Sequence, residues 1–587
     1  MRFWKLLIVP ALVASTSNTV RAGGLEYTGA GAQALGRGGA VTAKADDPMV
    51  LAYNPAGLAE LRGNQLLLDV NIANMNACVD PVGYYGWGAY GGGTASRLRN
   101  PSTGETLDLN LGDGKPGPAE QYYTDKLDTV CAKTRPFPVP QLAFTARLTE
   151  RLGVGFGLIF PAATPQGQWG ESNGVIQGAN GLRPAATRYM MIQAGTLGLF
   201  PTAGFGFQVA RWLRIGAAFE WGIINIDNLS MAAKVGGTSP ANDILARAQG
   251  TDWFVPAATG SIHIVPTDAI DIVAAFRWSG DVEAPGTLTL TTGTFDAGGA
   301  PLTNVEQIQR INQKMPWKAR AGIRYASRLS PRAVGDGRDE VGGIPGRRVH
   351  DAFEDERWDL EADVEYQINS RNQEQVVSGA LNQTVGFAFA NGTMNSVVYP
   401  MSAWRGGTTD TVIQKRWKDQ FSVRVGGSYN VMPGLFGISL GAHYETRGVD
   451  PSYMQVDYWP VSRVGLHGGV RFRIGRTIDL VASYSHMFQE TLVVGAPPTD
   501  PGGTDAISTR FSNTGVVDAI DKHSGVAATR GAAIPELIEP AMGNIDGVAK
   551  VQQVTTSVSQ GRPPTLINAG TYRSGIDVVA VGVNVHF

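Results

Sequence analysis

In its central part the chain reads Trp358-Asp359-Leu360-Glu361-Ala362-Asp363-Val364-Glu365-Tyr366, with an acidic side chain at every second position. Successive side chains of a β-strand point to opposite faces, so this stretch predicts a strand with one apolar and one acidic face. A helix would instead repeat its apolar positions about every 3.6 residues. The segment before it carries Lys318, Arg320 and Arg324 in the polar phase, and the segment after it carries Arg424. We therefore expect three neighbouring strands whose polar faces are basic, acidic and basic.

The same two-residue period returns along most of the chain. Fourteen segments carry it or a looser form of it, and an even strand number is typical of single-chain bacterial barrels. A strand of roughly 9–11 residues can cross the hydrocarbon core of a membrane. The pattern therefore predicts an all-β fold, a 14-stranded antiparallel transmembrane β-barrel. The segments are 66–72, 142–148, 154–160, 196–209, 215–223, 253–264, 270–278, 317–325, 358–366, 421–429, 438–444, 466–474, 478–484 and 579–587.

The connections between these segments alternate in length. Short turns alternate with long loops, at about 77–138, 162–194, 228–250, 279–313, 370–412 and 490–571. Short periplasmic turns and long extracellular loops are the rule in outer-membrane barrels. The connection at about 328–356 is long, charged and glycine-rich although it lies on the short-turn side. We interpret it as a flexible periplasmic insertion.

Composition and the two chain ends agree with a barrel in the bacterial outer membrane. Charged residues make up 17% of the 587, and the mean hydropathy is −0.08, so the chain is not apolar overall. No apolar run reaches the roughly 18 residues of a spanning helix, and the net charge of −2 disfavours a nucleic-acid partner. Residues 1–22 resemble a secretory signal peptide, with Arg2 and Lys5 before a short apolar run. The terminal Phe587 resembles the signal that the barrel assembly machinery reads. A large soluble all-β protein is the alternative.

The basic and acidic rows are expected to face the lumen. A lipid-facing Lys or Arg costs roughly 2–4 kcal/mol at the membrane midplane, whereas cross-strand pairing contributes about 0.2–1 kcal/mol. The rows form either a selectivity filter or a structural ladder of charges, and we favour the ladder because the signs cancel. The lumen residues are Lys318, Arg320, Arg324, Asp359, Glu361, Asp363, Glu365 and Arg424.

The chain has two cysteines, Cys78 and Cys131, and both lie in the expected exported part. An even pair in an oxidising compartment predicts one disulfide, here in the first external loop. Two free buried cysteines are the alternative.

No motif of metal, cofactor or enzyme chemistry stands out. The seven histidines lie outside any HExxH or Cys–His pattern, and the chain has neither GxSxG nor GxxxxGK[ST]. The glycine-rich run at 29–39 lacks the strand and Lys-Ser/Thr end of a phosphate loop. An outer-membrane lipase is the enzyme alternative, but Ser485 and His486 are neighbours on one strand and point to opposite faces. We therefore predict a non-enzyme without cofactor or metal.

Residues 23–62 precede the first strand and do not alternate. They contain Leu35-Gly36-Arg37-Gly38-Gly39-Ala40, then Ala45-Asp46-Asp47-Pro48, then Asn54-Pro55-Ala56. In this order, directly after a signal peptide, these runs resemble the N-terminal hatch of the FadL/TodX family of outer-membrane transporters for hydrophobic compounds. The resemblance implies a hatch over 23–62 that plugs the lumen of a barrel over 63–587. It also implies ligands such as long-chain fatty acids, which bind near the hatch and leave sideways through a gap at the third strand.

The resemblance also suggests site residues. The hatch motif is Asn54, Pro55 and Ala56, and the ligand pocket would include Leu25, Tyr27, Leu51, Tyr53, Leu58 and Phe160. The lateral opening would lie at Pro161, Ala162, Ala163, Pro165 and Gly167, where Pro161 cannot donate a hydrogen bond to a neighbouring strand. The family often has Pro-aromatic-Gly where this chain has Pro161-Ala162-Ala163.

The function predicted from these features is passive transport of hydrophobic molecules across the outer membrane. An apolar solute gains roughly 0.8 kcal/mol per buried CH₂, which a water-filled pore does not offer. The alternatives are a general or weakly selective porin, and an adhesin or structural barrel that uses the loop at 490–571. The hatch favours the transporter over the porin. Expected partners are hydrophobic small molecules, outer-membrane lipid and the barrel assembly machinery, and we expect a monomer.

Overall fold

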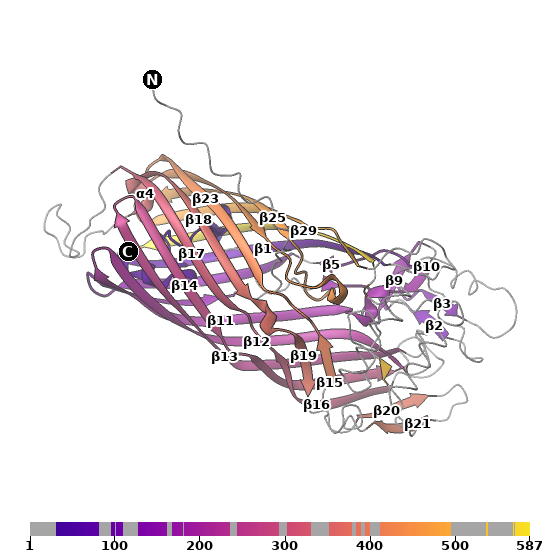
Figure 1. Cartoon of the computed structure of the whole chain (residues 1–587). Coiled ribbons are helices and arrows are strands. Elements are labelled where there is room, and N and C mark those ends of the chain that lie inside the picture. The colour runs from indigo at the N-terminus through magenta and orange to yellow at the C-terminus, as the bar shows by residue number, and fades with distance from the viewer. Residues whose placement is uncertain are drawn as a thin grey trace, which may run out of the picture.

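A computed structural model shows a closed barrel of fourteen antiparallel strands (Figure 1), which confirms the predicted fold. The structure describes residues 31–81, 96–99, 101–109, 127–134, 136–160, 167–179, 181–234, 243–292, 302–329, 351–378, 383–388, 394–399, 411–494, 536–537, 568 and 570–587. The signal peptide and residues 23–30, with Leu25 and Tyr27, lie outside these residues.

Each predicted segment lies in one strand of the barrel wall. The first and last strands close the barrel, with Gln65 opposite His586 and Ile72 opposite Val579. In wall order the strands are β1 (Asn64–Pro81), β6 (Phe137–Arg147), β7 (Leu152–Ile159), β11 (Gln193–Ala210), β12 (Leu213–Lys234), β13 (Asp243–Thr267), β14 (Ile270–Ser279), β17 (Trp317–Arg328), β18 (Glu356–Ile368), β23 (Gln420–Met432), β24 (Phe436–Glu445), β25 (Arg463–Ile474), β26 (Ile478–Gln489) and β29 (Gly570–His586).

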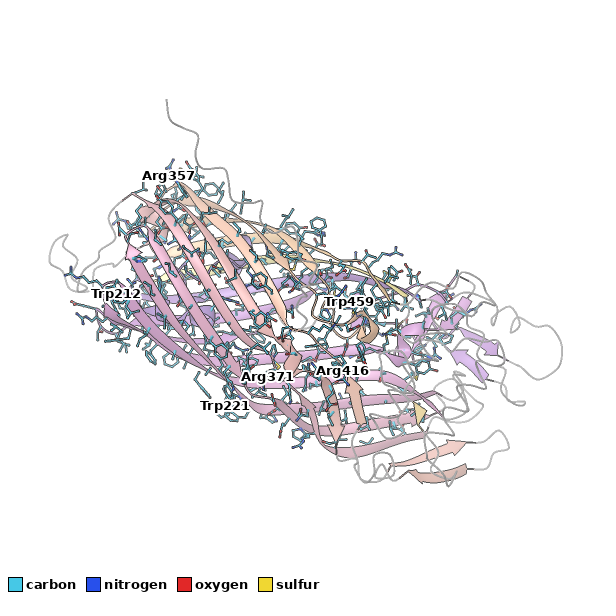
Figure 2. All side chains as sticks on the ribbon, viewed as in Figure 1. Trp212, Trp221, Arg357, Arg371, Arg416 and Trp459 are labelled. Carbon is cyan, nitrogen blue, oxygen red and sulfur yellow. A yellow bond between two sulfur atoms is a disulfide. The ribbon has the colours of Figure 1, made fainter. Side chains whose placement is uncertain are left out.

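The alternation places apolar side chains outside and polar side chains inside. On β18, Leu360 is 53% exposed whereas Glu361 is fully buried. Trp212 and Trp221 point away from the wall (Figure 2), as aromatic residues do at the two edges of a lipid-facing belt. Among the described residues, no helix combines the length and the apolar character that a membrane-spanning helix needs.

The extracellular side contains more strand than the sequence indicated. The segments expected as loops at 228–250 and 279–313 are largely strand, because β12 and β13 run beyond the belt and β15 (Val282–Thr292) pairs with β16 (Leu302–Gln313). Beyond lipid both faces of a strand meet water or loops, so the alternation weakens there. The remaining strands are β2 (Ser96–Arg99), β3 (Thr106–Leu109), β4 (Val130–Cys131), β5 (Lys133–Thr134), β8 (Gly167–Gln168), β9 (Val175–Gly178), β10 (Gly181–Pro184), β19 (Glu374–Ser378), β20 (Gln383–Ala388), β21 (Met394–Tyr399), β22 (Thr411–Gln414), β27 (Leu492–Val494) and β28 (Glu536–Leu537).

Cys78 and Cys131 form the predicted disulfide, with their Cα atoms 4.0 Å apart. The prediction placed both residues in the first external loop, but Cys78 belongs to β1, which continues to Pro81, and it lies opposite Cys131 in β4. The bond therefore fastens β4, near the end of the first extracellular connection, to the wall strand β1.

The segment before β1 packs inside the barrel. It contains α1 (Ala32–Gly36), α2 (Val50–Tyr53) and the 3₁₀ helix η1 (Pro55–Ala59), and nearly all of its side chains are buried. The first helix α1 contacts β24, β25, β26 and β29, whereas η1 contacts β7, β11, β12 and β13 on the far side of the barrel. We refer to residues 31–62 as the hatch segment.

The expected insertion at 328–356 is partly structured. Residues 330–350 lie outside the described residues, but Ala352–Asp355 form the helical turn α4, and β18 begins at Glu356. The flexible interpretation is therefore wrong for residues 351–356. The helical turn lies at the end of the barrel that also contains the C-terminus (Figure 1). Other short helices are η2 (Ala186–Tyr189), η4 (Asn369–Arg371) and η6 (Pro451–Tyr453).

Candidate functional site: the hatch segment and the lumen cavity

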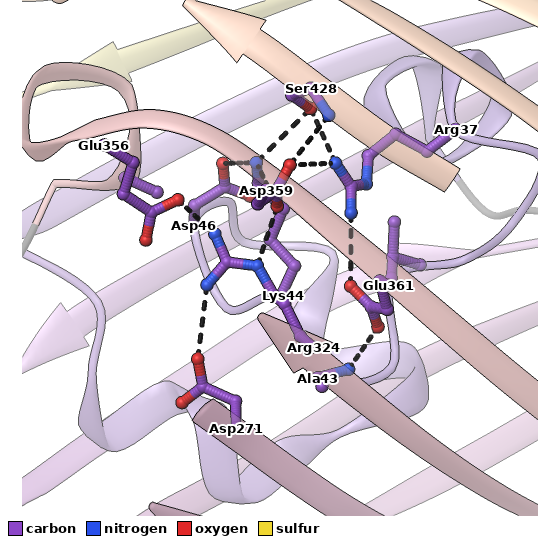
Figure 3. Close-up of polar contacts among 12 residues, drawn as sticks. Arg37, Ala43, Lys44, Asp46, Asp271, Arg324, Glu356, Asp359, Glu361 and Ser428 are labelled. Carbon is purple, nitrogen blue, oxygen red and sulfur yellow. Dashed lines mark hydrogen bonds and ion pairs between the residues drawn. The ribbon is translucent and has the colours of Figure 1, made fainter. Parts of the chain in front are cut away.

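The hatch segment binds the acidic row of β18 through two cations. The Arg37 guanidinium donates to Asp359 at 2.7 Å and to Glu361 at 3.2 Å, and Lys44 donates to Asp359 at 3.1 Å. All four side chains are buried (Figure 3). Removing one member of a buried ion pair leaves an uncompensated charge, so these contacts fix the position of the segment.

Main-chain groups of the hatch segment bind the rest of the row. The Ala43 N–H donates to Glu361 at 2.6 Å, and the N–H groups of Val41 and Thr42 donate to one oxygen of Asp363 at 3.1 and 3.0 Å. The Thr42 hydroxyl donates to the same oxygen at 2.6 Å. The backbone at 41–43 thus satisfies its donors on the wall of the barrel instead of within a helix.

The ladder interpretation expects the acidic row to pair with the two basic rows, and part of the row does so. Arg320 donates to Glu365 at 2.7 Å, Arg424 to Glu365 at 3.0 Å, and Arg324 to Asp359 at 2.7 Å. Sequence reasoning missed the contribution of Arg37 and Lys44. The available signal was the presence of two cations in a segment assigned to the lumen, since buried cations need acidic partners.

Glycines of the wall let the hatch backbone come close. A Cβ atom at Gly216 would lie 2.2 Å from the Ala56 nitrogen, and one at Gly441 would lie 2.1 Å from the Arg37 carbonyl carbon. Gly153 similarly faces the Leu58 carbonyl oxygen, at 2.0 Å from an added Cβ. These positions lie on opposite sides of the barrel, so close backbone contact holds the segment from both sides.

The Asn54-Pro55-Ala56 motif forms the start of η1. Asn54 is fully buried and donates from Nδ2 to the Thr42 carbonyl at 3.0 Å. The Ala56 N–H donates to the Ser261 hydroxyl of β13 at 2.8 Å. Pro55 occupies the first helical turn, where its missing N–H has no cost. The motif thus joins two turns of the hatch segment and also contacts the wall.

Neighbouring carboxylates of the hatch segment differ in acidity. Burial, together with the charges of Asp46 and Asp69, raises the pKa of Asp47 to about 8. Burial alone would raise the pKa of Asp46 as well, but Lys44 and Arg471 beside it lower that pKa below its ordinary value. The pair therefore carries one ionised and one protonated carboxyl near neutral pH.

A cavity of about 100 Å³ lies above the hatch segment. One side is apolar and the other contains cations and carboxylates on the inner faces of β12, β14, β17, β18, β23 and β24. Of the predicted pocket residues, Tyr53 and Phe160 line the cavity, whereas Leu51 and Leu58 lie in the apolar core between the hatch segment and the wall. The apolar lining includes Leu35, Val41, Ala52, Tyr53, Ala73, Val139, Ile159, Phe160 and Val578, and the charged lining is Glu220, Arg277, Lys318, Arg320, Glu365, Arg424 and Glu445.

The cavity reaches the wall where strand pairing changes. The β6–β7 pairing ends at Leu142 opposite Leu158, and β7 itself ends at Ile159. The next part of β6 contains Pro138 and Pro140, which have no N–H to donate. Of the predicted lateral opening, Pro161, Ala162, Ala163 and Pro165 lie outside the described residues, and Gly167 pairs with Ala194 in β8–β11. Sequence reasoning missed the two prolines of β6.

An apolar cluster connects the cavity with the extracellular segments. Leu35 and Ala73 of the cavity lining belong to a buried cluster that continues through Met75 and Val79 to Trp169, Trp459 and Tyr572. Trp169 stacks on Trp459 with ring centroids 5.7 Å apart. A dry, apolar stretch thus extends from the outer segments to the hatch segment.

A buried group of Glu60, His263 and Asp271 has ligand atoms within 4.8 Å of one another, as a metal site would require. His263 lies between the carboxylates, with Nδ1 3.6 Å from Glu60 and Nε2 3.1 Å from Asp271. Arg214 lies 2.9 Å from Glu60, and Arg324 lies 3.2 Å from Asp271. These guanidinium groups already neutralise the carboxylates, so the arrangement fits an ion-pair network that joins the hatch segment to the wall.

Comparison with solved structures shows the same fold. A Pseudomonas aeruginosa FadL homologue matches with a TM-score of 0.58 and 12% identity, over 96% of this chain and 100% of that chain. The Pseudomonas putida toluene transporter TodX matches with a TM-score of 0.51 and 12% identity, over 95% of this chain and 99% of that chain. No protein-family model and no curated protein sequence matches this chain. At this identity the likeness establishes the barrel fold.

Proposed function

We propose that the chain is a FadL-type transporter, which carries hydrophobic molecules passively across the bacterial outer membrane. The observation that carries the proposal is the cavity, because it joins an apolar side above the hatch segment to a charged side on the wall with four cations and three carboxylates. The shared fold of the FadL homologue and TodX supports the assignment.

The favoured substrate class is long-chain fatty acids. Each buried CH₂ of an acyl chain contributes roughly 0.8 kcal/mol, and the apolar lining and the cluster behind it offer that burial. A carboxylate also forms strong charge-assisted hydrogen bonds to Arg and Lys, and Lys318, Arg320 and Arg424 line the other side. Arg424 pairs with Glu365 through Nη2, and its Nε and Nη1 have no hydrogen-bond partner among the described residues, so they can donate to a bound carboxylate.

The favoured exit is sideways through the wall. The cavity lining includes Val139 and Gln141 of β6 and Ile159 and Phe160 at the end of β7, which flank the change in strand pairing. A solute released there enters lipid and keeps an apolar environment, whereas release into the periplasm would expose it to water. Pro138 and Pro140 weaken the pairing on the same side.

Ligand analysis tests the substrate class. Lipophilic molecules extracted from the purified barrel and identified by mass spectrometry should be fatty acids. Arg320→Gln should weaken binding of a labelled long-chain fatty acid while Arg424 still neutralises Glu365. Arg247→Gln, in an exposed pair with Asp227 outside the cavity, serves as the matched control and should bind as the wild type. Co-purified neutral hydrocarbons, with equal fatty-acid binding by both variants, would contradict the assignment.

A crosslink across the wall tests the exit. Cysteines introduced by Pro140→Cys and Ala162→Cys, joined by a short thiol crosslinker, should stop uptake of a labelled fatty acid. The control is Val464→Cys with Phe488→Cys, which are paired across the regular β25–β26 wall. Uptake that continues after a verified crosslink at the first pair would rule out the lateral route.

Ion conductance distinguishes the proposed transporter from the porin alternative. An open porin conducts ions in planar bilayers, whereas a lumen occupied by the hatch segment should conduct poorly. A wild-type conductance typical of an open pore would favour the porin. Deletion of residues 495–565 tests the adhesin alternative. Fatty-acid uptake that stays intact would show that this loop serves a purpose other than transport.

A further inference from the structure

The segment Asp351–Asp355, which we call the floor lock, occupies the periplasmic end of the barrel. Phe353 is almost fully buried, and the guanidinium carbons of Arg471 and Arg473 lie 4.6 and 5.1 Å from its ring centroid. Both arginines belong to β25 and are held by Asp479 of β26, at 2.7 Å from Arg471 and 2.9 Å from Arg473. The Phe353 ring therefore lies within the mouth of the barrel, against two inward-facing cations of the wall.

Main-chain hydrogen bonds fix the floor lock to the surrounding turns. Asn430 of β23 donates from Nδ2 to the Ala352 carbonyl at 3.0 Å, and the Gly434 N–H donates to the Phe353 carbonyl at 2.8 Å. Gly434 has a φ of +74°, and an added Cβ there would lie 2.7 Å from Cγ of Glu354. The β23–β24 turn is therefore shaped to receive the floor lock.

The floor lock is also joined to the hatch segment at two points. Asp351 accepts from Arg473 at 2.6 Å and from Arg62, at the end of the hatch segment, at 3.4 Å. Arg471, which covers the Phe353 ring, donates to Asp46 of the hatch segment at 3.0 Å. The hatch segment, the wall and the floor lock thus share one network of charges, in which Arg62 is partly exposed and the other members are buried.

We propose that the floor lock is a permanent floor beneath the hatch segment, which closes the periplasmic mouth and prevents the hatch from leaving the lumen downward. It explains why a long connection lies on the short-turn side, because residues 351–355 reach into the mouth, which a tight turn could not do. Substrate passage then proceeds while the floor stays closed. This last consequence rests on the proposed transport function, whereas the closure itself does not.

Thiol labelling and conductance test the closure. Both native cysteines form the disulfide, so Ala45→Cys adds a single reactive thiol in the hatch segment. Combining it with Phe353→Ala and Asp351→Asn should increase the labelling rate and the bilayer conductance above those of the parent. Glu283→Gln, which changes an exposed ion pair in the outer hairpin, should leave both unchanged. Unchanged labelling and conductance in a folded floor-lock variant would overturn the proposal.

A second pair keeps the proposal testable if that variant does not fold. Glu354→Cys and Leu435→Cys lie on the floor lock and on the adjoining turn, and a short thiol crosslinker should join them. Crosslinked protein should take up labelled fatty acid as fast as the same variant before crosslinking. Loss of uptake on crosslinking would mean that the floor must open, and would overturn the proposal. Absence of uptake before crosslinking would instead count against the transport function.

Discussion

Individual residues explain how a lumen full of charges can be stable. Asp359 accepts hydrogen bonds from Arg37, Lys44 and Arg324. Glu361 accepts hydrogen bonds from Arg37 and the Ala43 N–H. Each buried carboxylate thus has several donors, which offsets the loss of its hydration. On the outer face of the strand the same carboxylates would lower the stability of the barrel. Whether they stabilise or destabilise it therefore depends on which face of the strand they occupy.

Replacing Arg37 by methionine tests the hatch anchor. Arg37→Met removes one partner of two buried acids, so we expect a loss of about 3–5 kcal/mol in the free energy of unfolding, together with higher conductance. Arg247→Met removes a half-exposed cation and should change stability by about 0–1 kcal/mol. Urea titrations of the purified barrels compare the two. Equal stability of both variants would remove the anchoring role.

The phase of β18 can be tested with two adjacent substitutions. Leu360→Arg places a cation toward lipid, which costs roughly 2–4 kcal/mol at the midplane, so membrane insertion should fall. Glu361→Leu should insert normally, but it leaves Ala43 and part of Arg37 without an acceptor and should raise conductance. Heat modifiability on gels reports insertion. Equal insertion of both variants would contradict the assigned phase.

At the scale of elements, the hatch segment fits the wall because the segment supplies hydrogen-bond donors and the wall supplies acceptors. The turn at 37–44 has main-chain donors and cations, and β18 has acceptors. Glycines at the contact remove the side chains that would separate the backbones. The helices of the hatch segment are short, so tertiary contacts rather than helix propensity hold them in place.

Filling one glycine position should displace the Asn54-Pro55-Ala56 motif. A side chain from Gly216→Val would lie in the space of the Ala56 backbone, and overpacking of this kind costs typically 1–3 kcal/mol. Gly260→Val, on the neighbouring strand, has open space around an added Cβ and is the control. We expect higher conductance for the first variant only. Identical conductance would show that the motif tolerates displacement.

The acidity of Asp47 predicts a pH dependence of hatch packing. When the segment is displaced, Asp47 ionises near its ordinary value of 3.8, but when packed it keeps its proton until about pH 8. Stabilisation by the packed state is therefore complete below the ordinary value and is lost as the pH rises through about 8. Relative to the rate of a free thiol at each pH, labelling of Ala45→Cys should accelerate between about pH 4 and about pH 8. Asp47→Asn should flatten this dependence of the labelling rate on pH. If the dependence stays equally steep in this variant, a group other than Asp47 causes it.

At the scale of the whole molecule, a closed wall surrounds the hatch segment and a cavity between apolar and charged surfaces. The extracellular cluster, the hatch segment and the floor lock follow one another along the lumen. In the proposed function the hatch segment and the floor lock obstruct straight passage, whereas the wall changes its pairing beside the cavity. This arrangement is what separates the proposed transporter from an open pore.

Removing the hatch should convert the barrel into a pore. A variant without residues 23–60 keeps all fourteen wall strands, so we expect it to insert, to conduct ions strongly and to lose selective fatty-acid uptake. Planar-bilayer recordings and uptake assays measure the two effects. Conductance that stays at the wild-type level would mean that these residues do not plug the lumen.

The wall of this protein could be predicted from its sequence. A two-residue period follows directly from strand geometry, and lipid enforces it by penalising polar side chains on the outer face, so strand number and phase could be inferred from residues such as Leu360 and Glu361. The paired cysteines likewise predicted the disulfide. Outside the membrane belt that pressure is absent, so the sequence pattern does not distinguish β15 and β16 from a loop.

The contacts that fill the barrel could not be predicted from the sequence. The partners of Arg37 lie more than 300 residues away in sequence, at Asp359 and Glu361, and no local pattern relates them. The cavity lining is drawn from the hatch segment and at least ten strands of the wall, and the floor lock places Phe353 against Arg471 and Arg473 of another hairpin. Such contacts depend on closure of the barrel, which brings distant segments into one lumen, and local propensity contains no information about that closure.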